Sequence, residues 1–324
     1  MTTTSIDALA ATQVGSLTST QVRLLSAGQI GALSSTEIQA FTATQNAALT
    51  AAQFGGLSNA TLELFSLDQF AGLTTTQLRG LNATQLNGLS TASLNALDLS
   101  KATTTQISGL DTTAIGELSN DQVGGFLTTQ VASLSAAQIG ALSSAQIQAF
   151  SSAQADALTA AQLGGLSNAT LGRFSTDQLA AFSTAQLCGL TTAQLNALST
   201  EALGALDLTK ATTAQIAGLN TTAIDALSEA QVGALSSAQV ASLSATQIGA
   251  LSSTEVQAFS TAQFDALTAA QLSGLTDTAL GLFSTDQLAA LSTTQLRGLT
   301  TDQLNALTAE VLNVLDVSKA SVTQ

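Results

Sequence analysis

The chain has 324 residues, a net charge of −14 at pH 7, 9% charged residues, one Cys and no His, Trp, Tyr or Pro. An acidic chain with few Lys and Arg argues against nucleic-acid binding, which depends on cationic contacts to phosphate. Without His the usual general base, metal ligand and pH switch are missing, and a single Cys excludes a disulfide framework. We therefore predict no enzyme, no cofactor and no nucleic-acid partner. No apolar run approaches the roughly 20 residues of a membrane span, which predicts no membrane insertion. The first residues also lack the pattern of a signal peptide.

One octapeptide fills nearly the whole chain, with 38 copies that begin at Thr2 and end at Leu315. Its pattern is [Ser/Thr]-x-x-Gln-[Leu/Ile/Val]-x-[Ala/Gly]-Leu, and we number its positions 1 to 8. Position 1 departs from Ser, Thr, Asn or Asp only at Ala10 and Leu127. Position 5 is a large apolar residue in all copies except two, which carry Asn46 and Ala155, and position 8 is always Leu or Phe.

Each octapeptide reads as a very short capped helix. A hydroxyl at position 1 with Gln or Glu three residues later is a capping box, in which each side chain binds the backbone N–H of the other residue. A cap every eight residues predicts a new helix every eight residues, too short to persist without packing against its neighbours. The sequence therefore predicts an all-α solenoid of capped short helices.

Two other folds compete with this interpretation. A β-solenoid would suit the many Ser, Thr, Val and Ile residues, but positions 5 and 8 share a face only in a helix. A single long helix fails because a period of eight moves the apolar stripe about 80° around the helix per copy.

Phe at position 8 indicates how many octapeptides form one turn of the solenoid. Pairs such as Phe41 with Phe65 and Phe259 with Phe283 are 24 residues apart, which favours three octapeptides per turn and leaves four possible. Positions 5 and 8 should face the core. Ala or Gly at position 7 should allow close approach between helices and unusual backbone angles at the corner.

A longer period of 109 residues overlies the octapeptide. A five-residue insert, Asp-Leu-Ser-Lys-Ala or a close variant, recurs at residues 98–102, 207–211 and 316–320. It divides one continuous solenoid into modules 1–110, 111–219 and 220–324. In each insert a Lys lies three residues after an Asp, a spacing that allows a local ion pair. We interpret the insert as a widened corner or a change in the direction of the solenoid.

The acids near the inserts are the best candidates for a metal, and they are weak ones. Calcium needs six to eight oxygen ligands, and Asp98, Asp111 and Asp207 are the nearest set. Asn220 replaces the acid at the position that matches Asp111. We predict no catalytic residue and no cofactor-binding residue.

Two resemblances follow from these motifs. The stretches Leu73-Thr-Thr-Thr-Gln-Leu78 and Leu158-Thr-Ala-Ala-Gln-Leu163 resemble the start of the first helix in transcription-activator-like effector repeats, through shared capping chemistry. Over nearly its whole length the chain is similar to Leu-Ser/Thr-x-x-Gln-Leu-x-Ala-Leu arrays of large proteobacterial proteins labelled as adhesins or heme-utilisation proteins. That resemblance implies a secreted or surface-anchored repeat region. With no His or Tyr, heme ligation by this segment is not expected.

The functional prediction is a non-catalytic structural rod, a stalk, matrix or adhesin segment of a large bacterial extracellular protein. Its location would be extracellular or on the cell surface. Its partners would be neighbouring repeats of a longer chain, with possible end-to-end self-association. The alternative is a surface-, glycan- or ice-binding module that uses the Ser/Thr/Gln face.

Overall fold

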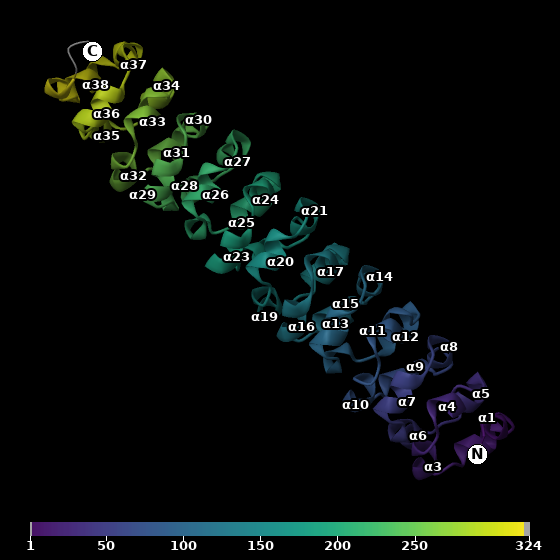
Figure 1. Cartoon of the computed structure of the whole chain (residues 1–324). Coiled ribbons are helices and arrows are strands. Elements are labelled where there is room, and N and C mark those ends of the chain that lie inside the picture. Colours follow the sequence, from purple (N-terminus) through teal and green to yellow (C-terminus); the bar gives the residue numbers. More distant parts are fainter. Residues whose placement is uncertain (1, 321–324) are drawn as a thin grey trace. The chain divides into compact units, whose positions relative to one another are not determined.

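The computed structural model describes residues 2–320, which fall into two compact units, residues 2–158 and 159–320. The described part of the chain forms 38 α-helices and three 3₁₀ turns and holds no strand (Figure 1). The all-α solenoid of short helices is therefore confirmed, and the β-solenoid is excluded. None of the described helices is long and apolar enough to cross a membrane. The unit boundary falls inside the second 109-residue module, so the modules remain a division of the sequence.

The elements of the first unit are α1 (Thr3–Asp7), α2 (Ala11–Gly15), α3 (Ser19–Arg23), α4 (Ala27–Ile30), α5 (Ser35–Gln39), α6 (Ala43–Ala48), α7 (Ala51–Gly56), α8 (Asn59–Leu62), α9 (Leu67–Ala71), α10 (Thr75–Leu78), α11 (Ala83–Asn87), α12 (Thr91–Ala96), η1 (Leu99–Lys101), α13 (Thr104–Ser108), α14 (Thr112–Gly116), α15 (Asn120–Gly124), α16 (Thr128–Ser133), α17 (Ala136–Ala141), α18 (Ser144–Gln148) and α19 (Ser152–Asp156).

The elements of the second unit are α20 (Ala160–Gly164), α21 (Asn168–Leu171), α22 (Thr176–Ala180), α23 (Thr184–Gly189), α24 (Thr192–Ala197), α25 (Thr200–Ala205), η2 (Leu208–Lys210), α26 (Thr213–Ala217), α27 (Thr221–Asp225), α28 (Glu229–Ala234), α29 (Ser237–Ser242), α30 (Ala245–Ile248), α31 (Ser253–Gln257), α32 (Thr261–Asp265), α33 (Ala269–Ser273), α34 (Asp277–Leu280), α35 (Thr285–Ala289), α36 (Thr293–Gly298), α37 (Thr301–Ala306), α38 (Ala309–Val314) and η3 (Val317–Lys319).

The predicted capping box starts most of these helices. At α3 the Thr18 hydroxyl accepts a hydrogen bond from the Gln21 backbone N–H at 3.2 Å, and the Gln21 Oε1 accepts one from the Thr18 N–H at 2.8 Å. Ala10 and Leu127, which have no hydroxyl, keep the second half of the box: their N–H groups donate to Gln13 and Gln130. The glutamine therefore caps the helix start even where position 1 cannot.

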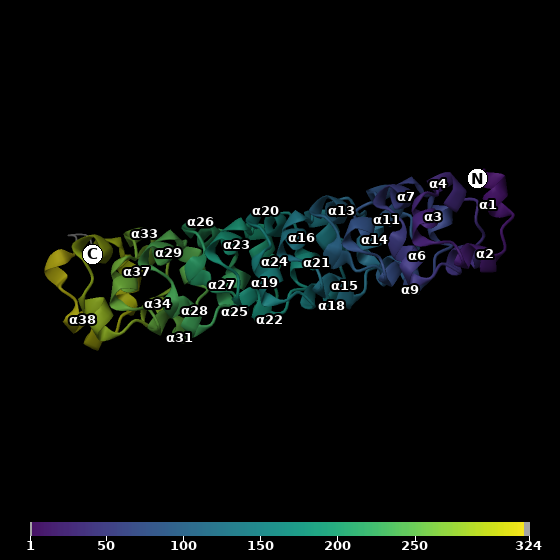
Figure 2. The same ribbon diagram turned by 90° about the horizontal axis from the view of Figure 1, so that it is seen from below.

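Three helices make one turn of the coil in each unit. In the first unit α2 packs on α5 and α3 packs on α6, and in the second α20 packs on α23 and α33 on α36, always three elements apart (Figures 1 and 2). Phe259 and Phe283, 24 residues apart, stack with ring centroids 6.4 Å apart. Three octapeptides per turn is therefore confirmed, and four per turn is wrong.

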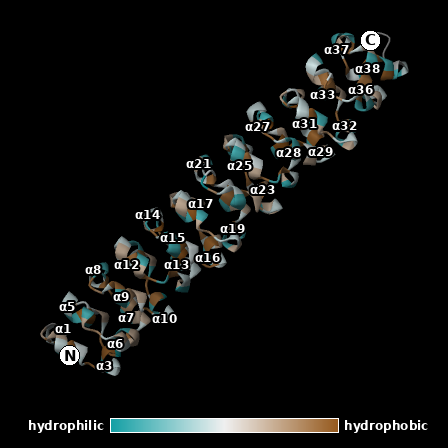
Figure 3. Cartoon of the chain, turned by 180° about the vertical axis from the view of Figure 1, so that it is seen from behind, coloured by the Kyte–Doolittle hydropathy of each residue, from teal (hydrophilic) through white to brown (hydrophobic). Residues whose placement is uncertain are grey.

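The core of each unit is built from positions 5 and 8, as predicted. Leu78 and Leu81 of one octapeptide are 1% and 2% exposed, and most of their equivalents along the coil are buried as well. The exceptions include Leu198 and Leu304, which are half-buried, and Leu312, which is 38% exposed. Figure 3 shows apolar and polar residues interspersed along the short helices. The two exceptions at position 5, Asn46 and Ala155, are buried as well. Position 5 is thus a core position in most octapeptides, including the two that carry Asn or Ala.

The small residues at position 7 allow neighbouring turns to pack closely, and they do not adopt unusual backbone angles. A Cβ added to Gly80 would lie 2.4 Å from the carbonyl oxygen of Ala51 in the coil beneath. No described glycine or other residue has a positive φ. The expectation of unusual backbone angles at the corner is therefore wrong, because the chain turns through extended residues at the helix ends. Around α7, for example, Thr50 has ψ 159° and Leu57 has ψ 146°.

Candidate functional site: the glutamine clasp between coils

The glutamine at position 4 connects successive turns of the coil. The Gln77 side chain accepts from the Thr74 N–H at 2.9 Å through its Oε1. Its Nε2 donates to the backbone carbonyls of Asn46 at 2.7 Å and Leu49 at 2.8 Å, which are 31 and 28 residues earlier. One side chain therefore caps its own helix and binds the end of a helix in the preceding turn. We call this arrangement the glutamine clasp.

The spacing of the clasp follows from three helices per turn. A corner between two helices lies over the corner three helices earlier, so the start of each helix lies over the end of the helix four places before it. The last carbonyls of an α-helix have no partner within the helix. The clasp supplies a donor to the position 8 carbonyl and a second donor to the position 5 carbonyl, which also accepts from the position 8 N–H of its own octapeptide, as Asn46 does from Leu49 at 3.2 Å. Each such bond contributes about 1 kcal/mol net, and a buried carbonyl left without one costs about 1–3 kcal/mol.

The clasp recurs along both units. Glutamines that donate to both a position 5 carbonyl and a position 8 carbonyl in the preceding turn include Gln45, Gln53, Gln77, Gln85, Gln106, Gln130, Gln138 and Gln154 in the first unit, and Gln194, Gln215, Gln239, Gln247, Gln263, Gln271, Gln295 and Gln303 in the second.

Where an octapeptide lacks the glutamine, an asparagine in the preceding turn can supply the capping oxygen. Position 4 after Asp111 is Ala114, and the Asp111 N–H donates to the Asn87 Oδ1 at 2.9 Å. In the second unit the Asn220 N–H donates to the Asn196 Oδ1 at 2.8 Å in the same way. The N–H at the start of the helix is then capped by a side chain of the preceding turn, so the contact still joins two turns.

Glu63 performs this role at one further position. Ser93 occupies position 4 of the octapeptide that starts at Ser90. The Glu63 carboxylate accepts from the Ser90 N–H at 2.7 Å, from its hydroxyl at 2.9 Å and from the Ser93 hydroxyl at 3.0 Å. A carboxylate from the preceding turn thus replaces the missing amide.

The insert is a shortened side of the coil. The Gln239 Nε2 donates to the carbonyls of Leu208 at 2.8 Å and Ala211 at 2.9 Å, with the same 31- and 28-residue offsets as in a full octapeptide. The turn η2 packs between α23 below and α28 above. The insert therefore corresponds to positions 4–8 of an octapeptide that lacks positions 1–3. The interpretation of the insert as a widened corner is wrong, because the insert forms one of the three sides of a turn of the coil.

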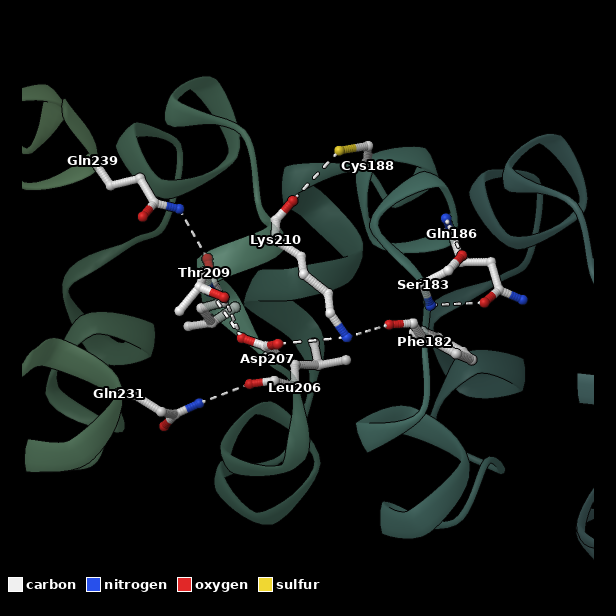
Figure 4. A network of polar contacts seen from close by, with 11 residues as sticks. Phe182, Ser183, Gln186, Cys188, Leu206, Asp207, Thr209, Lys210, Gln231 and Gln239 are labelled. Atoms are coloured by element: carbon white, nitrogen blue, oxygen red, sulfur yellow. Dashed lines mark hydrogen bonds and ion pairs between the residues drawn. The ribbon is translucent and has the colours of Figure 1, made fainter. Parts of the chain in front are cut away.

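The insert lysine replaces the clasp amide. The Lys210 Nζ donates to the Phe182 carbonyl at 3.0 Å, 28 residues earlier, and pairs with Asp207 at 3.4 Å (Figure 4). Lys101 and Lys319 make the matching contacts, and their ion pairs with the insert aspartates measure 3.2 and 3.7 Å. The predicted local ion pair is confirmed, and its lysine also links two turns.

A hydrogen bond from the Thr209 hydroxyl, 2.6 Å away, is the main cause that lowers the pKa of Asp207, and Lys210 lowers it further. The pKa of Asp98 is lowered in the same way, first by the hydroxyl of Ser100. These groups are partly exposed, so their ion pairs contribute only a few tenths of a kcal/mol.

The side chain 22 residues before each insert lysine donates to the backbone carbonyl of that lysine. Arg79 and Arg297 do so through Nε at 3.0 and 3.1 Å, to Lys101 and Lys319. Cys188 occupies the same position in the second module, and its exposed thiol lies 3.5 Å from the Lys210 carbonyl (Figure 4). The cysteine is thus a weaker copy of an arginine contact.

The three calcium candidates each have their own partners. Asp98 pairs with Lys101, Asp207 pairs with Lys210, and Asp111 caps α14 by accepting from the Ala114 N–H at 2.8 Å. Among the described residues, no three His, Cys, Asp or Glu side chains come together as a metal site. Calcium binding by these residues stays an untested hypothesis.

The donor role of the glutamine was not predicted from the sequence, although a signal for it exists. A capping box accepts Gln or Glu equally, yet position 4 holds Glu only at Glu37 and Glu255. Such a bias indicates that the N–H₂ group is needed as well as the oxygen. Both glutamates keep the cap, as Ser34 and Ser252 donate to them at 2.7 and 2.6 Å.

The fold and the clasp define a tandem-repeat α-solenoid of octapeptide units. The ALTTAQ repeat family matches five times, over just over half of the chain, so this chain belongs to that family; the matches cover residues 131–168, 171–208, 210–245, 230–261 and 281–316.

Other comparisons add little. No curated protein matches the chain. Among solved structures, the leucine-rich repeat-containing protein LegL7 from Legionella pneumophila is similar at 11% identity, over 76% of this chain and 92% of that one. Its TM-score is 0.17, which is too low to carry any argument about the fold.

Proposed function

We propose that the chain is a non-catalytic structural repeat segment of a large bacterial extracellular protein, where it serves as a stalk, matrix or adhesin segment. The observation that carries the proposal is the glutamine clasp. Each turn is joined to the next by buried hydrogen bonds such as those of Gln271 to Val240 and Leu243. These bonds need no ligand, and further turns can be added with the same contacts.

A spacer function predicts that length depends on the number of turns. Small-angle scattering should compare the chain with a version that carries one more copy of residues 111–219. We expect the maximum dimension to increase by a constant length for each added copy, because each turn contacts only its neighbours. A maximum dimension that does not change with the extra copy would contradict the spacer proposal.

The extracellular location is supported by the similarity to repeat arrays of large proteobacterial surface proteins. Labelling intact cells of the source bacterium with an antibody against the chain tests it. We expect labelling without permeabilisation. Labelling only after permeabilisation would contradict the location and leave the spacer proposal to the scattering experiment.

A further inference from the structure

Glu255 is a buried acid at a position that an amide occupies in most other octapeptides. Its side chain is 6% exposed, and its Oε2 accepts from the Ser252 N–H at 2.6 Å. Its other oxygen, Oε1, has no hydrogen-bond partner among the described residues. That oxygen still reaches solvent, since the Asn46 Oδ1 is the one fully buried side-chain atom without a partner in the described part of the chain. A buried carboxylate is normally paired with a charge or bound to a metal.

The Glu255 carboxylate takes the place of a clasp amide over the end of α27 in the preceding turn. One module earlier, the matching Gln146 donates through Nε2 to the Leu118 carbonyl at 2.5 Å, 28 residues before it. The equivalent carbonyl for Glu255 is that of Leu227, and no described residue donates a hydrogen bond to it. Because a carboxylate cannot donate, two sets of acceptors meet here without a donor between them.

Asp225 supplies a second carboxylate to the same place. It is the last residue of α27, it is exposed, and it precedes Glu255 by 30 residues. Side chains at this offset meet in the first unit, where the Glu63 carboxylate accepts from the Ser93 hydroxyl at 3.0 Å. Aspartate is one methylene shorter than glutamate, so it leaves space between the two carboxylates for a bound ion.

The chain offers no cationic side chain to this cluster. No Lys or Arg occurs between Lys210, which pairs with Asp207 at 3.4 Å, and Arg297. The charge of Glu255 and Asp225 must therefore be balanced from solution.

The pairing of the two acids recurs along the sequence. Two module periods earlier, Glu37 is 8% exposed and accepts from the Ser34 N–H at 2.7 Å. The residue 30 positions before Glu37 is again an aspartate, Asp7. The module between has Gln146 and Gly116 at these two positions. Both glutamates at position 4 thus have an aspartate 30 residues earlier, and the module with glutamine has neither acid.

We propose that Glu255, Asp225 and the Leu227 carbonyl bind a calcium ion. Calcium takes six to eight oxygen ligands, from carboxylates, backbone carbonyls and water. The ion accepts the lone pairs of the Glu255 Oε1 and the Leu227 carbonyl, so it joins the start of α31 to the preceding turn as a clasp amide does elsewhere. Three protein ligands make the site a weak one, and we expect a Kd of about 10⁻⁴–10⁻³ M.

Isothermal titration calorimetry with CaCl₂ tests the proposal on the full chain carrying Glu37→Gln, which leaves Glu255 as the single position 4 glutamate. We expect one site. Glu255→Gln should abolish binding and keep the fold, because glutamine restores the clasp. Asp225→Asn should weaken binding about tenfold or more. Magnesium should bind more weakly than calcium, because it requires octahedral geometry and dehydrates reluctantly.

Asp265→Asn is the matched control. Asp265 is an exposed aspartate at the same octapeptide position, but the residue 30 positions later is Gln295, whose Nε2 donates to the Leu267 carbonyl at 2.9 Å. No carbonyl there lacks a clasp donor, so this substitution should leave calcium affinity unchanged. Urea unfolding gives a second readout: calcium should raise the midpoint of the Glu37→Gln chain and should not raise it once Glu255→Gln is added.

Three results would overturn the proposal. One is the absence of binding up to about 10 mM CaCl₂, well above the expected Kd. Another is binding that persists in Glu255→Gln, which would assign calcium to other acids such as Asp98 and Asp207. The third is an equal loss of affinity in Asp225→Asn and Asp265→Asn, which would assign the effect to net charge alone.

Discussion

The Nε2 of Gln194 lies 2.8 Å from the backbone carbonyl oxygen of Leu163, 31 residues earlier, and 2.9 Å from that of Leu166. Its Oε1 accepts from the Thr191 N–H at 2.8 Å. A single side chain thereby caps one short helix and binds the end of another. None of these helices exceeds six residues, and helices of that length do not persist alone in water. Contacts of this kind must therefore contribute much of the stability of each turn.

Replacing a clasp glutamine should destabilise the chain strongly. In Gln194→Ala the Leu166 carbonyl loses the Gln194 donor and the Thr191 N–H loses its acceptor, while the Leu163 carbonyl keeps only the Leu166 N–H at 3.1 Å. We expect the free energy of unfolding to fall by about 2–4 kcal/mol, measured by urea denaturation. Gln257→Ala, which removes an exposed glutamine, is the control and should change stability by less than about 0.5 kcal/mol. Equal effects of the two substitutions would contradict the clasp.

Converting a glutamate cap to glutamine should stabilise the second unit. Glu255 accepts from the Ser252 N–H but has no N–H₂ group with which to bind the preceding turn. In the register of the other clasps, Glu255→Gln would reach the carbonyls of Ile224 and Leu227. We expect a gain of about 1 kcal/mol in the free energy of unfolding, seen as a higher denaturation midpoint with an unchanged slope. A loss of stability would mean that the carboxylate has a partner that the amide cannot replace.

Two glycines of the second unit should respond to alanine in opposite directions. A Cβ on Gly189 would lie 2.6 Å from the Cα, Cβ and carbonyl oxygen of Ala160, whereas a Cβ on Gly204 would have nothing within 4 Å. Gly189→Ala should therefore cost about 1–3 kcal/mol through overpacking. Gly204→Ala should gain about 0.5–1 kcal/mol, because alanine favours helix more than glycine does. Thermal unfolding of the two variants checks both signs, and destabilisation by both would show that position 6 is also tightly packed.

The pKa of Asp207 should depend on the Thr209 hydroxyl. That pKa is lowered from 3.8, so the contribution of Asp207 to stability is present above pH 3.8 and is lost as pH falls through the lower folded value. We expect Thr209→Ala to raise the pKa of Asp207 toward 3.8, as measured by NMR titration of the carboxyl carbon.

The matched variant Lys210→Gln removes the ion pair and keeps the hydroxyl, and it should raise this pKa by less than Thr209→Ala does. The loss of the ion pair in Lys210→Gln should lower the free energy of unfolding by only a few tenths of a kcal/mol, because the pair is partly exposed. The loss of the hydrogen bond to the Phe182 carbonyl should lower it by about 1 kcal/mol more. The opposite order of the two variants would make the ion pair, and not the hydroxyl, the main cause.

The sequence by itself determined the local structure of this protein. A hydroxyl at position 1 and an amide at position 4 define a helix start, and apolar residues at positions 5 and 8 define its buried face, because both depend on contacts within eight residues. The 24-residue spacing of Phe259 and Phe283 also predicted three helices per turn, since stacked rings must repeat once per turn.

Only the tertiary structure decided what happens between turns. The second partner of each glutamine is 28 or 31 residues away, as for Gln194 and Leu163, and nothing within one octapeptide encodes that distance. The insert at 207–211 looks like an interruption in the sequence, yet it forms one shortened side of the coil, and Lys210 binds the carbonyl that an amide would otherwise bind. The carboxylates of Glu255 and Asp225 likewise come from different turns. These features follow from how turns stack, and stacking brings together residues that local rules treat as unrelated.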